Sequence, residues 1–300
     1  MTRGLALFML ILAGIVGALL IAHGYYGWTL FVILPFGLGF AGAWVAKAAT
    51  HKKAILAGML AAILASLSLL ALGVEGLACV IMSWPIAAPL GAFGGSVYYQ
   101  LRKVENPQAI SMLILLPLGT TAYDVTAKPD VFSVHSQIQI AAPAETVWKN
   151  VVAFTEITEP REWYFHTGLA YPIRSHIEGS GPGAMRYCEF STGPFVEPIE
   201  TWDEPRLLRF TVLKSPAPMH EWSPYGDIHP KHLDGYLISK RGQFKLTALD
   251  ARHTLLEGTT WYQHSLWPAQ YWRWWSDAII HRIHLRVLRH IKAEAERSSD

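Results

Sequence analysis

The densest group of chemically active side chains lies in segment 214–235, KSPAPMHEWSPYGDIHPKHLDG. His229 and His232, with Asp227 or Asp234, offer the ligand types that zinc and related metals accept, although their spacing matches no specific metal motif. Long loops in compact domains are usually lids or binding loops. We therefore predict a lid at 219–232 and no cofactor; a proline-stiffened loop whose histidines bond to the backbone is the simpler alternative. The predicted ligand contacts of this lid are Met219, His220, Trp222, His229 and His232.

Tryptophan is concentrated near the end of the chain. Nine of the twelve tryptophans follow residue 124, and five of them lie between 261 and 275. Tryptophan carries a large apolar area with one polar group. Such a cluster can line a pocket for a ring or a lipid chain, dock the domain on a bilayer, or close the base of a helix. We predict that Trp261, Trp272 and Trp275 contact an apolar ligand.

A candidate acid–base pair lies in the last predicted helix. Asp277 and His281 are four residues apart and share one helix face, with His284 three residues further on. A carboxylate that orients an imidazole is the beginning of general-base machinery, and His264 at a neighbouring strand end is a third candidate catalytic residue. No serine or cysteine lies in a nucleophile elbow. The alternative is a surface pair without a catalytic role.

Polar residues also fall within a predicted strand at 184–190. Arg186 and Glu189 differ by three positions and therefore point to opposite faces of the sheet. We predict that one of them is a buried polar group in the cavity and that Arg186 contacts the ligand. Cys188 shares the face of Arg186 and is interpreted as a small apolar residue.

These side chains need a sheet and a long helix to position them. Residues 131–140 end in alternation typical of a half-buried strand, and Pro143 opens a short helix with an apolar face. Apolar runs bounded by turn residues predict further strands, and an amphipathic helix closes the chain from 268 to about 297. A curved antiparallel sheet around one long helix leaves room for a small molecule. The further strands are predicted at 171–177, 184–190, 195–202, 207–213, 236–249 and 253–264.

Segment 133–296 resembles the START-like, helix-grip superfamily, which includes polyketide cyclases, dehydrases and lipid-transfer domains. The resemblance rests on Ile138-x-Ile140-x-x-Pro143-x-x-x-Val147-Trp148, on Gly181-Pro-Gly183-Ala-Met-Arg186 and on the final helix. It implies an α+β helix-grip domain at 126–300. The motifs are structural and leave the ligand open, because this superfamily serves many ligands.

The first 125 residues have a different composition. The chain is 51% apolar and 16% charged, and residues 1–123 hold only six of its 25 Lys and Arg and two of its 23 acids. Five apolar segments, at 4–22, 28–46, 54–73, 77–99 and 109–123, predict an all-α bundle of about five transmembrane helices. The last is the shortest and carries Pro117.

The loops between these segments alternate between basic and non-basic. Arg3, Lys47, Lys52, Lys53, Arg102 and Lys103 fall in alternate connections. Because cytoplasmic loops collect Lys and Arg, we predict a multi-pass protein of a bacterial inner membrane whose C-terminal domain is extracytoplasmic, or cytoplasmic if the fifth segment does not cross. The C-terminal part has no positive excess, which excludes nucleic-acid binding.

Together these features predict a membrane-anchored START-like domain that binds or transfers a hydrophobic small molecule or lipid. The alternatives are a cyclase- or dehydrase-like enzyme that uses the histidines and Asp277, and a membrane-associated sensor or interaction module. The expected partners are the bilayer, the hydrophobic ligand and a second copy of the chain in a homo-oligomer.

Overall fold

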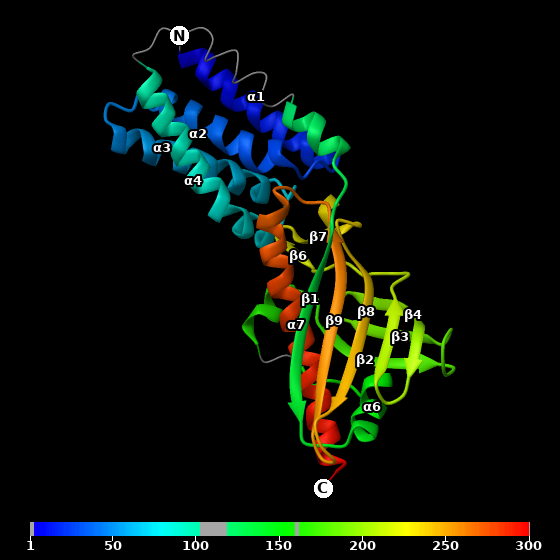
Figure 1. Ribbon diagram of the computed structural model, residues 1–300. Coiled ribbons are helices and arrows are strands. Elements are labelled where there is room, and N and C mark those ends of the chain that lie inside the picture. The colour runs from blue at the N-terminus through cyan, green and yellow to red at the C-terminus, as the bar shows by residue number, and fades with distance from the viewer. Residues whose placement is uncertain (1–2, 103–118, 160–161, 300) are drawn as a thin grey trace. The chain divides into compact units, whose positions relative to one another are not determined.

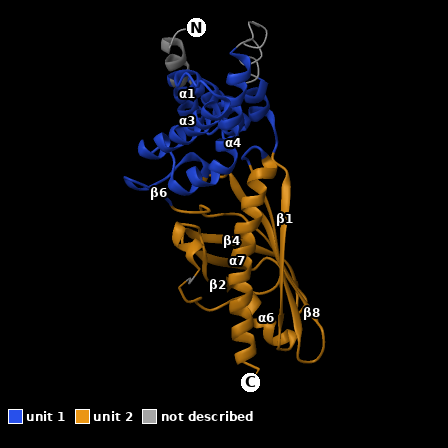
Figure 2. Cartoon of the chain, turned by 90° about the vertical axis from the view of Figure 1, so that its left-hand side faces the viewer, with its two compact units in different colours: residues 1–128, 221–232, 265–268 blue, residues 129–220, 233–264, 269–300 orange. Residues whose placement is uncertain are grey.

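The computed structural model describes residues 3–102, 119–159 and 162–299, apart from the side chains of 3–10 and 13. The chain forms two compact units (Figure 2). The N-terminal unit contains Met1–Lys128 together with two later segments, Glu221–His232 and Ser265–Pro268. The C-terminal unit contains the remaining residues from Pro129 onward. The return of two short segments to the first unit does not follow from the hydropathy pattern.

The N-terminal unit is helical. Its elements are α1 (Arg3–Ala22), η1 (Thr29–Ile33), α2 (Leu34–Val45), α3 (His51–Ala71) and α4 (Leu77–Leu101). Among the described residues, α3 and α4 are long and apolar enough to span a membrane, whereas Thr29–Val45 is a shorter apolar helix. The prediction of five crossings is therefore not confirmed. Of the fifth predicted segment, 109–118 lie outside the described residues, and 119–126 are helical.

Helices α2, α3 and α4 approach one another through glycine. A Cβ atom on Gly39 would lie 2.1 Å from the carbonyl oxygen of Gly91, and one on Gly58 would lie 2.3 Å from the same oxygen. A Cβ atom on Gly95 would lie 2.1 Å from the carbonyl oxygen of Ala54. No larger residue fits these positions without moving a helix, and such small-residue contacts are typical of helices packed in membranes.

Segment 221–232 forms a small hairpin of β6 (Glu221–Ser223) and β7 (Gly226–Ile228), followed by η3 (Lys231–Leu233). Within the N-terminal unit, the Tyr225 hydroxyl donates to the carbonyl oxygen of Ala71 at 2.8 Å. The backbone N–H of Cys79 donates to a carboxylate oxygen of Glu221 at 3.2 Å. These contacts hold the hairpin against the end of α3 and the beginning of α4.

The C-terminal unit consists of one sheet, one long helix and short connecting helices. Its seven strands follow the order β1-β9-β8-β5-β4-β3-β2, and every neighbouring pair is antiparallel. Figure 1 shows α7 along one face of this sheet. The strands are β1 (Val131–Ile140), β2 (Pro172–Glu178), β3 (Met185–Phe190), β4 (Gly193–Asp203), β5 (Leu207–Thr211), β8 (Leu237–Ala248) and β9 (Thr254–His264); the helices are α6 (Ala144–Val152), η2 (Trp163–Thr167) and α7 (Ala269–Arg297).

The buried face of α7 differs from the stripe that its apolar spacing predicts, which consists of Trp275, Ile279, Ile283, Val287 and Ile291. Val287 and Ile291 are buried as expected, but about two turns before Val287 it is Ile280, and not Ile279, that is buried. Arg286, which the spacing predicts to lie beside or opposite this stripe, is 7% exposed and donates to the carbonyl oxygens of Pro172 and Thr158. The periodicity located the helix, but it did not fix the rotation of the helix about its axis.

The core of the C-terminal unit lies at one end of α7. Leu208 and Leu256 of the sheet, Val147 of α6, and Leu288 and Ile291 of α7 are completely buried there. Burying a side chain of this size stabilises the fold by about 1.5–3 kcal/mol. This apolar end therefore fixes the helix against the sheet and leaves the adjacent stretch of the interface free to form a cavity.

Candidate functional site

A cavity of about 120 Å³ lies between the sheet and α7, within the C-terminal unit. Strands β3, β4, β5, β8 and β9 supply one wall, and Ile280, Ile283, His284 and Val287 of α7 supply the other. Most of the lining is apolar. Its aromatic residues are Phe154, Phe190, Phe195, Phe210 and Phe244.

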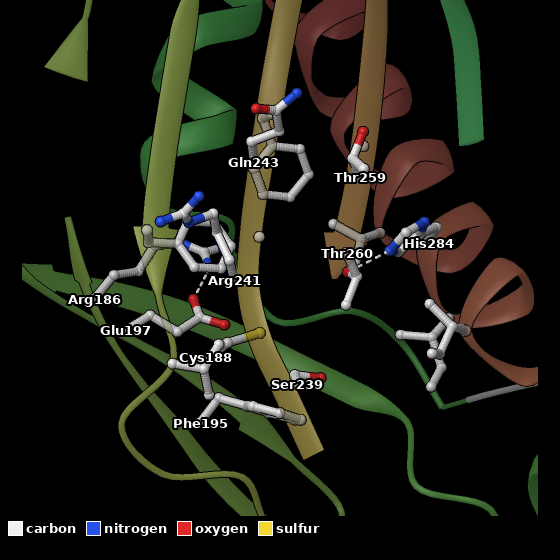
Figure 3. A pocket seen from close by; sticks show the side chains of 18 of the residues that line it. Arg186, Cys188, Phe195, Glu197, Ser239, Arg241, Gln243, Thr259, Thr260 and His284 are labelled. Carbon is white, nitrogen blue, oxygen red and sulfur yellow. Dashed lines mark hydrogen bonds and ion pairs between the residues drawn. The ribbon is translucent and has the colours of Figure 1, made fainter. Parts of the chain in front are cut away.

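One wall of the cavity contains a buried ion pair. The Arg186 guanidinium donates to the Glu197 carboxylate, which faces it across the β3–β4 pair, and to the carbonyl oxygen of Val152 at 3.3 Å. Figure 3 shows the two side chains turned toward one another at the edge of the pocket. The rings of Phe154, Phe210 and Phe244 lie 5.3–5.7 Å from the guanidinium carbon, within the range of cation–π attraction. Burial raises the pKa of Glu197, and Arg186 opposes part of that rise.

The opposite wall presents a neutral imidazole. Nε2 of His284 lies 2.8 Å from the Thr260 hydroxyl, and Nδ1 lies 3.0 Å from the Ser136 hydroxyl. Burial, followed by the nearby His281 and His135, lowers the pKa of His284 to about 4. The side chain is thus uncharged near neutral pH, and both of its ring nitrogens are hydrogen-bonded to hydroxyl groups. This arrangement holds the ring in place rather than leaving a nitrogen available as a base.

The strand order, the position of α7 against the sheet and the cavity between them together define the fold of the C-terminal unit. The C-terminal unit has a helix-grip fold, in which an antiparallel sheet packs against one long helix. This confirms the fold implied by the sequence resemblance, with β1 at its predicted limits and α7 within one residue of its predicted beginning.

Solved structures resemble the helix-grip unit. The Zhui aromatase/cyclase of Streptomyces sp. R1128 is 17% identical, with a TM-score of 0.40 over 57% of this chain and 97% of that one. Norcoclaurine synthase of Thalictrum flavum is 10% identical, with a TM-score of 0.38 over 58% and 100%. A Nitrosospira multiformis protein is 17% identical, with a TM-score of 0.35 over 56% and 99%. No family model and no curated protein matches the chain. At these values the likenesses carry no function to this chain.

The predicted catalytic residues lie apart from the cavity lining. Asp277 accepts hydrogen bonds from the Tyr262 hydroxyl at 2.6 Å and from Arg273 at 3.2 Å. His281 Nδ1 is hydrogen-bonded to the Ser136 hydroxyl at 2.7 Å. Among the described residues, no hydrogen bond joins Asp277 to His281, because the carboxylate is already engaged by Tyr262 and Arg273. His264 is 1% exposed and stacks on Phe132 with ring centres 5.2 Å apart.

Of the other residues predicted to contact the ligand, some line the cavity and some do not. Arg186 lines the cavity, and it is buried as one member of the predicted pair, whereas Glu189 on the same strand bonds to the exposed Arg174. The described lining does not include Trp261, Trp272 or Trp275. Trp272 is 3% exposed and packs edge-on against Tyr271. Their role in binding stays a prediction.

The residues of the predicted lid are divided between the two units, and their role as a lid stays a prediction. Met219 and His220 belong to the C-terminal unit, where Met219 bridges to Leu169 and His220 donates its backbone N–H to Gly168. Trp222, His229 and His232 belong to the N-terminal unit. Within the described chain, none of these five residues lines the cavity. Within the N-terminal unit, segment 221–232 folds as a hairpin on α3 and α4.

His232, one of the predicted metal ligands, has other neighbours than the sequence predicts. His232 is buried beside Glu75 and Cys79 rather than facing an aspartate, while His229 is exposed. Burial lowers the pKa of His232, but the combined effect of Glu221 and Glu75 raises it to about 9. The sequence offered no signal for this grouping, because Glu75 and Cys79 lie in the apolar part of the chain.

The reactivity of Cys188 is settled by its surroundings. The thiol lines the cavity, and burial raises its pKa to about 12. It therefore remains protonated at neutral pH, in agreement with its interpretation as a small apolar residue.

Proposed function

We propose that the helix-grip unit binds a hydrophobic small molecule about the size of one aromatic ring, and that the helical unit holds it at a membrane. The cavity beneath α7 is the observation that carries the binding part of this proposal. It is lined by phenylalanine rings and aliphatic side chains, with a few hydroxyl, amide and imidazole groups among them. This composition is typical of sites for apolar molecules that carry one polar group.

The size of the cavity narrows the ligand class. Its volume of about 120 Å³ is close to that of apolar cavities of about 150 Å³ that bind benzene. Pockets for drug-sized ligands measure about 300–1,000 Å³. A single ring or a short branched chain therefore fits, whereas a diacyl lipid needs the cavity to enlarge.

The charged group in the wall favours binding over acid–base chemistry. Arg186 donates to Glu197 and to the Val152 carbonyl, and both nitrogens of His284 are hydrogen-bonded. These groups shape the wall and can orient a ligand through its polar end. A cyclase- or dehydrase-like reaction is the alternative that the binding experiment also tests.

Gly258 provides the decisive substitution. It lies in β9 on the cavity wall, and a Cβ atom there would make ordinary 3.8 Å contacts with Leu288 and Phe244. Alanine at this position adds one carbon atom without a clash. Leucine extends three more carbon atoms into the cavity. Gly258→Leu is thus a blocked cavity, and Gly258→Ala is its matched control.

Binding can be measured on the full-length protein in mild detergent by ligand-detected NMR, with phenol and toluene as probes. The wild type and Gly258→Ala should bind at least one probe, and Gly258→Leu should bind it more than tenfold more weakly. The detergent is identical in all three samples, so partition of the probe into micelles cancels. Equal signals from all three proteins would overturn the proposal. Chemical conversion of a probe only by proteins with an open cavity would favour the enzyme alternative.

The membrane part of the proposal is supported by α3 and α4. These helices contain 21 and 25 residues, and about 20 apolar residues span a hydrocarbon core. The close glycine contacts between them support the proposal, because small residues are enriched where helices pack within lipid. We expect the protein to stay in the membrane fraction after alkaline carbonate treatment, and its release would contradict this part. The number of crossings and the side that carries the helix-grip unit stay predictions.

A further inference from the structure

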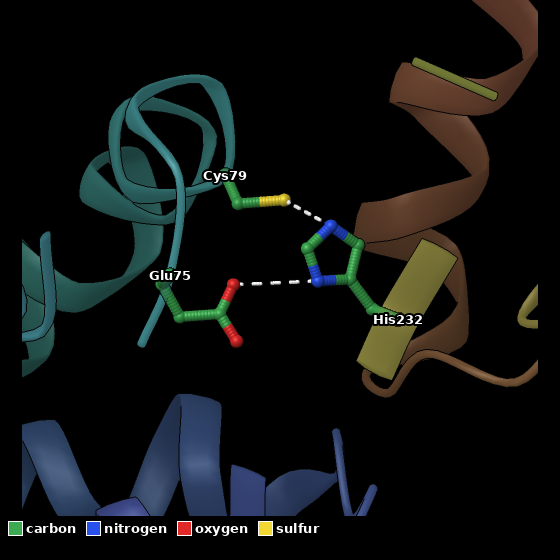
Figure 4. Close-up of side chains that lie close together, drawn as sticks. All are labelled: Glu75, Cys79 and His232. Atoms are coloured by element: carbon green, nitrogen blue, oxygen red, sulfur yellow. Dashed lines mark hydrogen bonds and ion pairs between the residues drawn. The ribbon is translucent and has the colours of Figure 1, made fainter. Parts of the chain in front are cut away.

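A second group of buried polar side chains lies in the N-terminal unit. Glu75 is in the turn between α3 and α4, Cys79 is in the first turn of α4, and His232 is in η3. Figure 4 shows the imidazole of His232 between the Cys79 thiol and the Glu75 carboxylate. Glu221 of β6 approaches the same imidazole. All four residues belong to one compact unit.

Three side chains of the kinds that bind metal ions surround the His232 imidazole, which is itself a fourth such group. His232 Nε2 lies 2.9 Å from Cys79 Sγ and 3.6 Å from Oε1 of Glu221. On the other side of the ring, Nδ1 lies 3.3 Å from Oε2 of Glu75. Ligand atoms of Glu75, Cys79 and His232 all lie within 4.8 Å of one another. Thiolate, imidazole and carboxylate are the three side-chain ligands of zinc sites.

Burial makes this cluster costly without a bound cation. Glu75, Glu221 and His232 are 5%, 0% and 7% exposed. Within the described residues, neither carboxylate forms an ion pair with lysine or arginine, and His232 is the cationic partner of both. Oε2 of Glu221 is buried and forms no hydrogen bond to any described residue. A buried carboxylate needs a full set of partners to offset its desolvation, and one imidazole does not supply two sets.

We propose that this cluster binds a divalent transition-metal ion of the zinc class. Cys79 Sγ, His232 Nε2 and the Glu221 carboxylate are the ligands, and one coordination position remains for water. The mixed sulfur, nitrogen and oxygen set selects zinc or cobalt over magnesium or calcium, which prefer oxygen ligands alone.

Glu75 has a distinct role as a positioning residue. A single imidazole binds one metal ion through one nitrogen, and Nε2 is the nitrogen that faces Cys79 and Glu221. Nδ1 then faces Oε2 of Glu75 at 3.3 Å, and this carboxylate favours a proton on Nδ1 and orients the ring, as carboxylates commonly do behind zinc-bound histidines. The Tyr26 hydroxyl holds Glu75 in turn, with a hydrogen bond of 2.5 Å to Oε1.

The metal ion would join two parts of the sequence that are far apart. Cys79 and Glu221 are separated by 142 residues, yet both contribute ligands. A metal ion bound by both fixes the hairpin 221–232 onto the beginning of α4, and its binding free energy adds to the stability of that contact. This site and the proposed ligand cavity are built from residues of different units, so either proposal can fail without the other.

Cobalt substitution tests the site directly. The full-length protein without a polyhistidine tag is purified in mild detergent, treated with a chelator and titrated anaerobically with Co²⁺ in a thiol-free reductant. We expect one equivalent of Co²⁺ to produce a sulfur-to-cobalt charge-transfer band, which added zinc abolishes. This experiment needs only the wild-type protein, so it does not depend on how the variants fold.

Two matched pairs of variants assign the ligands. Cys79→Ser should lose the charge-transfer band, while Cys188→Ser, which alters the other cysteine of the chain, should keep it. His232→Gln should lose it, while His229→Gln should keep it. Glu75→Gln retains an acceptor for Nδ1 and should keep the band but weaken binding by about 10–100-fold. Absence of the band in the wild type, its persistence in Cys79→Ser, or its loss in Cys188→Ser would each overturn the proposal.

Discussion

The two units solve the problem of buried charge in different ways. In the helix-grip unit, Arg186 and Glu197 face one another on neighbouring strands, so one cation meets one anion. In the helical unit, Glu75 and Glu221 share the single imidazole of His232. The first group is complete in itself, whereas the second has an excess of negative ligands. A buried group whose charges balance is thus a structural pair, whereas a buried group with an excess of carboxylates is a candidate site for a cation.

The largest expected effect comes from breaking the complete pair. Arg186→Met leaves the Glu197 carboxylate buried without its cation, which should lower the free energy of unfolding by about 3–5 kcal/mol. Hydrogen exchange measured in β3 and β4 reports this loss within the helix-grip unit.

The double variant Arg186→Met/Glu197→Leu is the control for this prediction. It removes both charges and keeps apolar volume, so it should recover most of the lost protection. If the double variant were as unstable as the single one, the pair would contribute by packing rather than by charge balance.

The second largest effect concerns stabilisation of the cluster around His232 by zinc. If the cluster binds zinc, free zinc at about 100 times its dissociation constant should raise the free energy of unfolding by about 2.7 kcal/mol. Hydrogen exchange in segment 221–232 should slow in parallel, because this segment carries two of the proposed ligands. The same zinc concentration should leave Cys79→Ser unchanged. Stabilisation of β3 and β4 alone would instead place the bound ion in the other unit.

A smaller effect concerns the neutral imidazole at the cavity. The pKa of His284 is lowered from 6.5 to about 4 in the folded protein. The unfolded chain therefore binds this proton more readily, and the free energy of unfolding should fall as the pH drops from about 6.5 toward 4. The loss attributable to His284 is on the order of 2 kcal/mol.

His284→Gln should remove this part of the pH dependence. His166→Gln is the matched control, because His166 is an exposed histidine of the same unit and is not among the groups that lower the pKa of His284. Chemical unfolding of the helix-grip unit, followed from pH 7 to pH 4, measures both variants. An equal slope in His284→Gln and the wild type would show that other groups dominate the acid sensitivity.

Much of the helix-grip fold could be predicted from the sequence. Alternation at 131–140, Pro143 before α6 and turn residues between the later strands are local signals, and the structure follows them closely. The number of membrane crossings was less certain, because hydropathy records apolar character but not helix length. Thr29–Val45 is apolar yet shorter than a typical span.

The sites were harder to predict than the fold. Arg186 could be found because strand alternation separates it from Glu189. The cluster around His232 could not, because Glu75 and Cys79 are distant in sequence and lie in a region whose pattern indicates only apolar helices. The fold of 221–232 could not be predicted for the same reason: long-range contacts with α3 and α4, and not local composition, decide where this segment folds.

The smallest expected effect comes from breaking an exposed ion pair of Glu189, which lies on the same strand, β3, as the buried Arg186. Glu189, which follows the buried Arg186 by three residues, accepts a hydrogen bond from Arg174 at 2.7 Å. The Arg174 side chain is 55% exposed, so water replaces its partner when the pair is broken. Arg174→Gln should leave the unfolding midpoint of the helix-grip unit unchanged within error, and added salt should not alter that result. A loss comparable to that of Arg186→Met would mean that pairing itself, rather than burial, determines the cost, and it would remove the reason for expecting a cation beside Glu75 and Glu221.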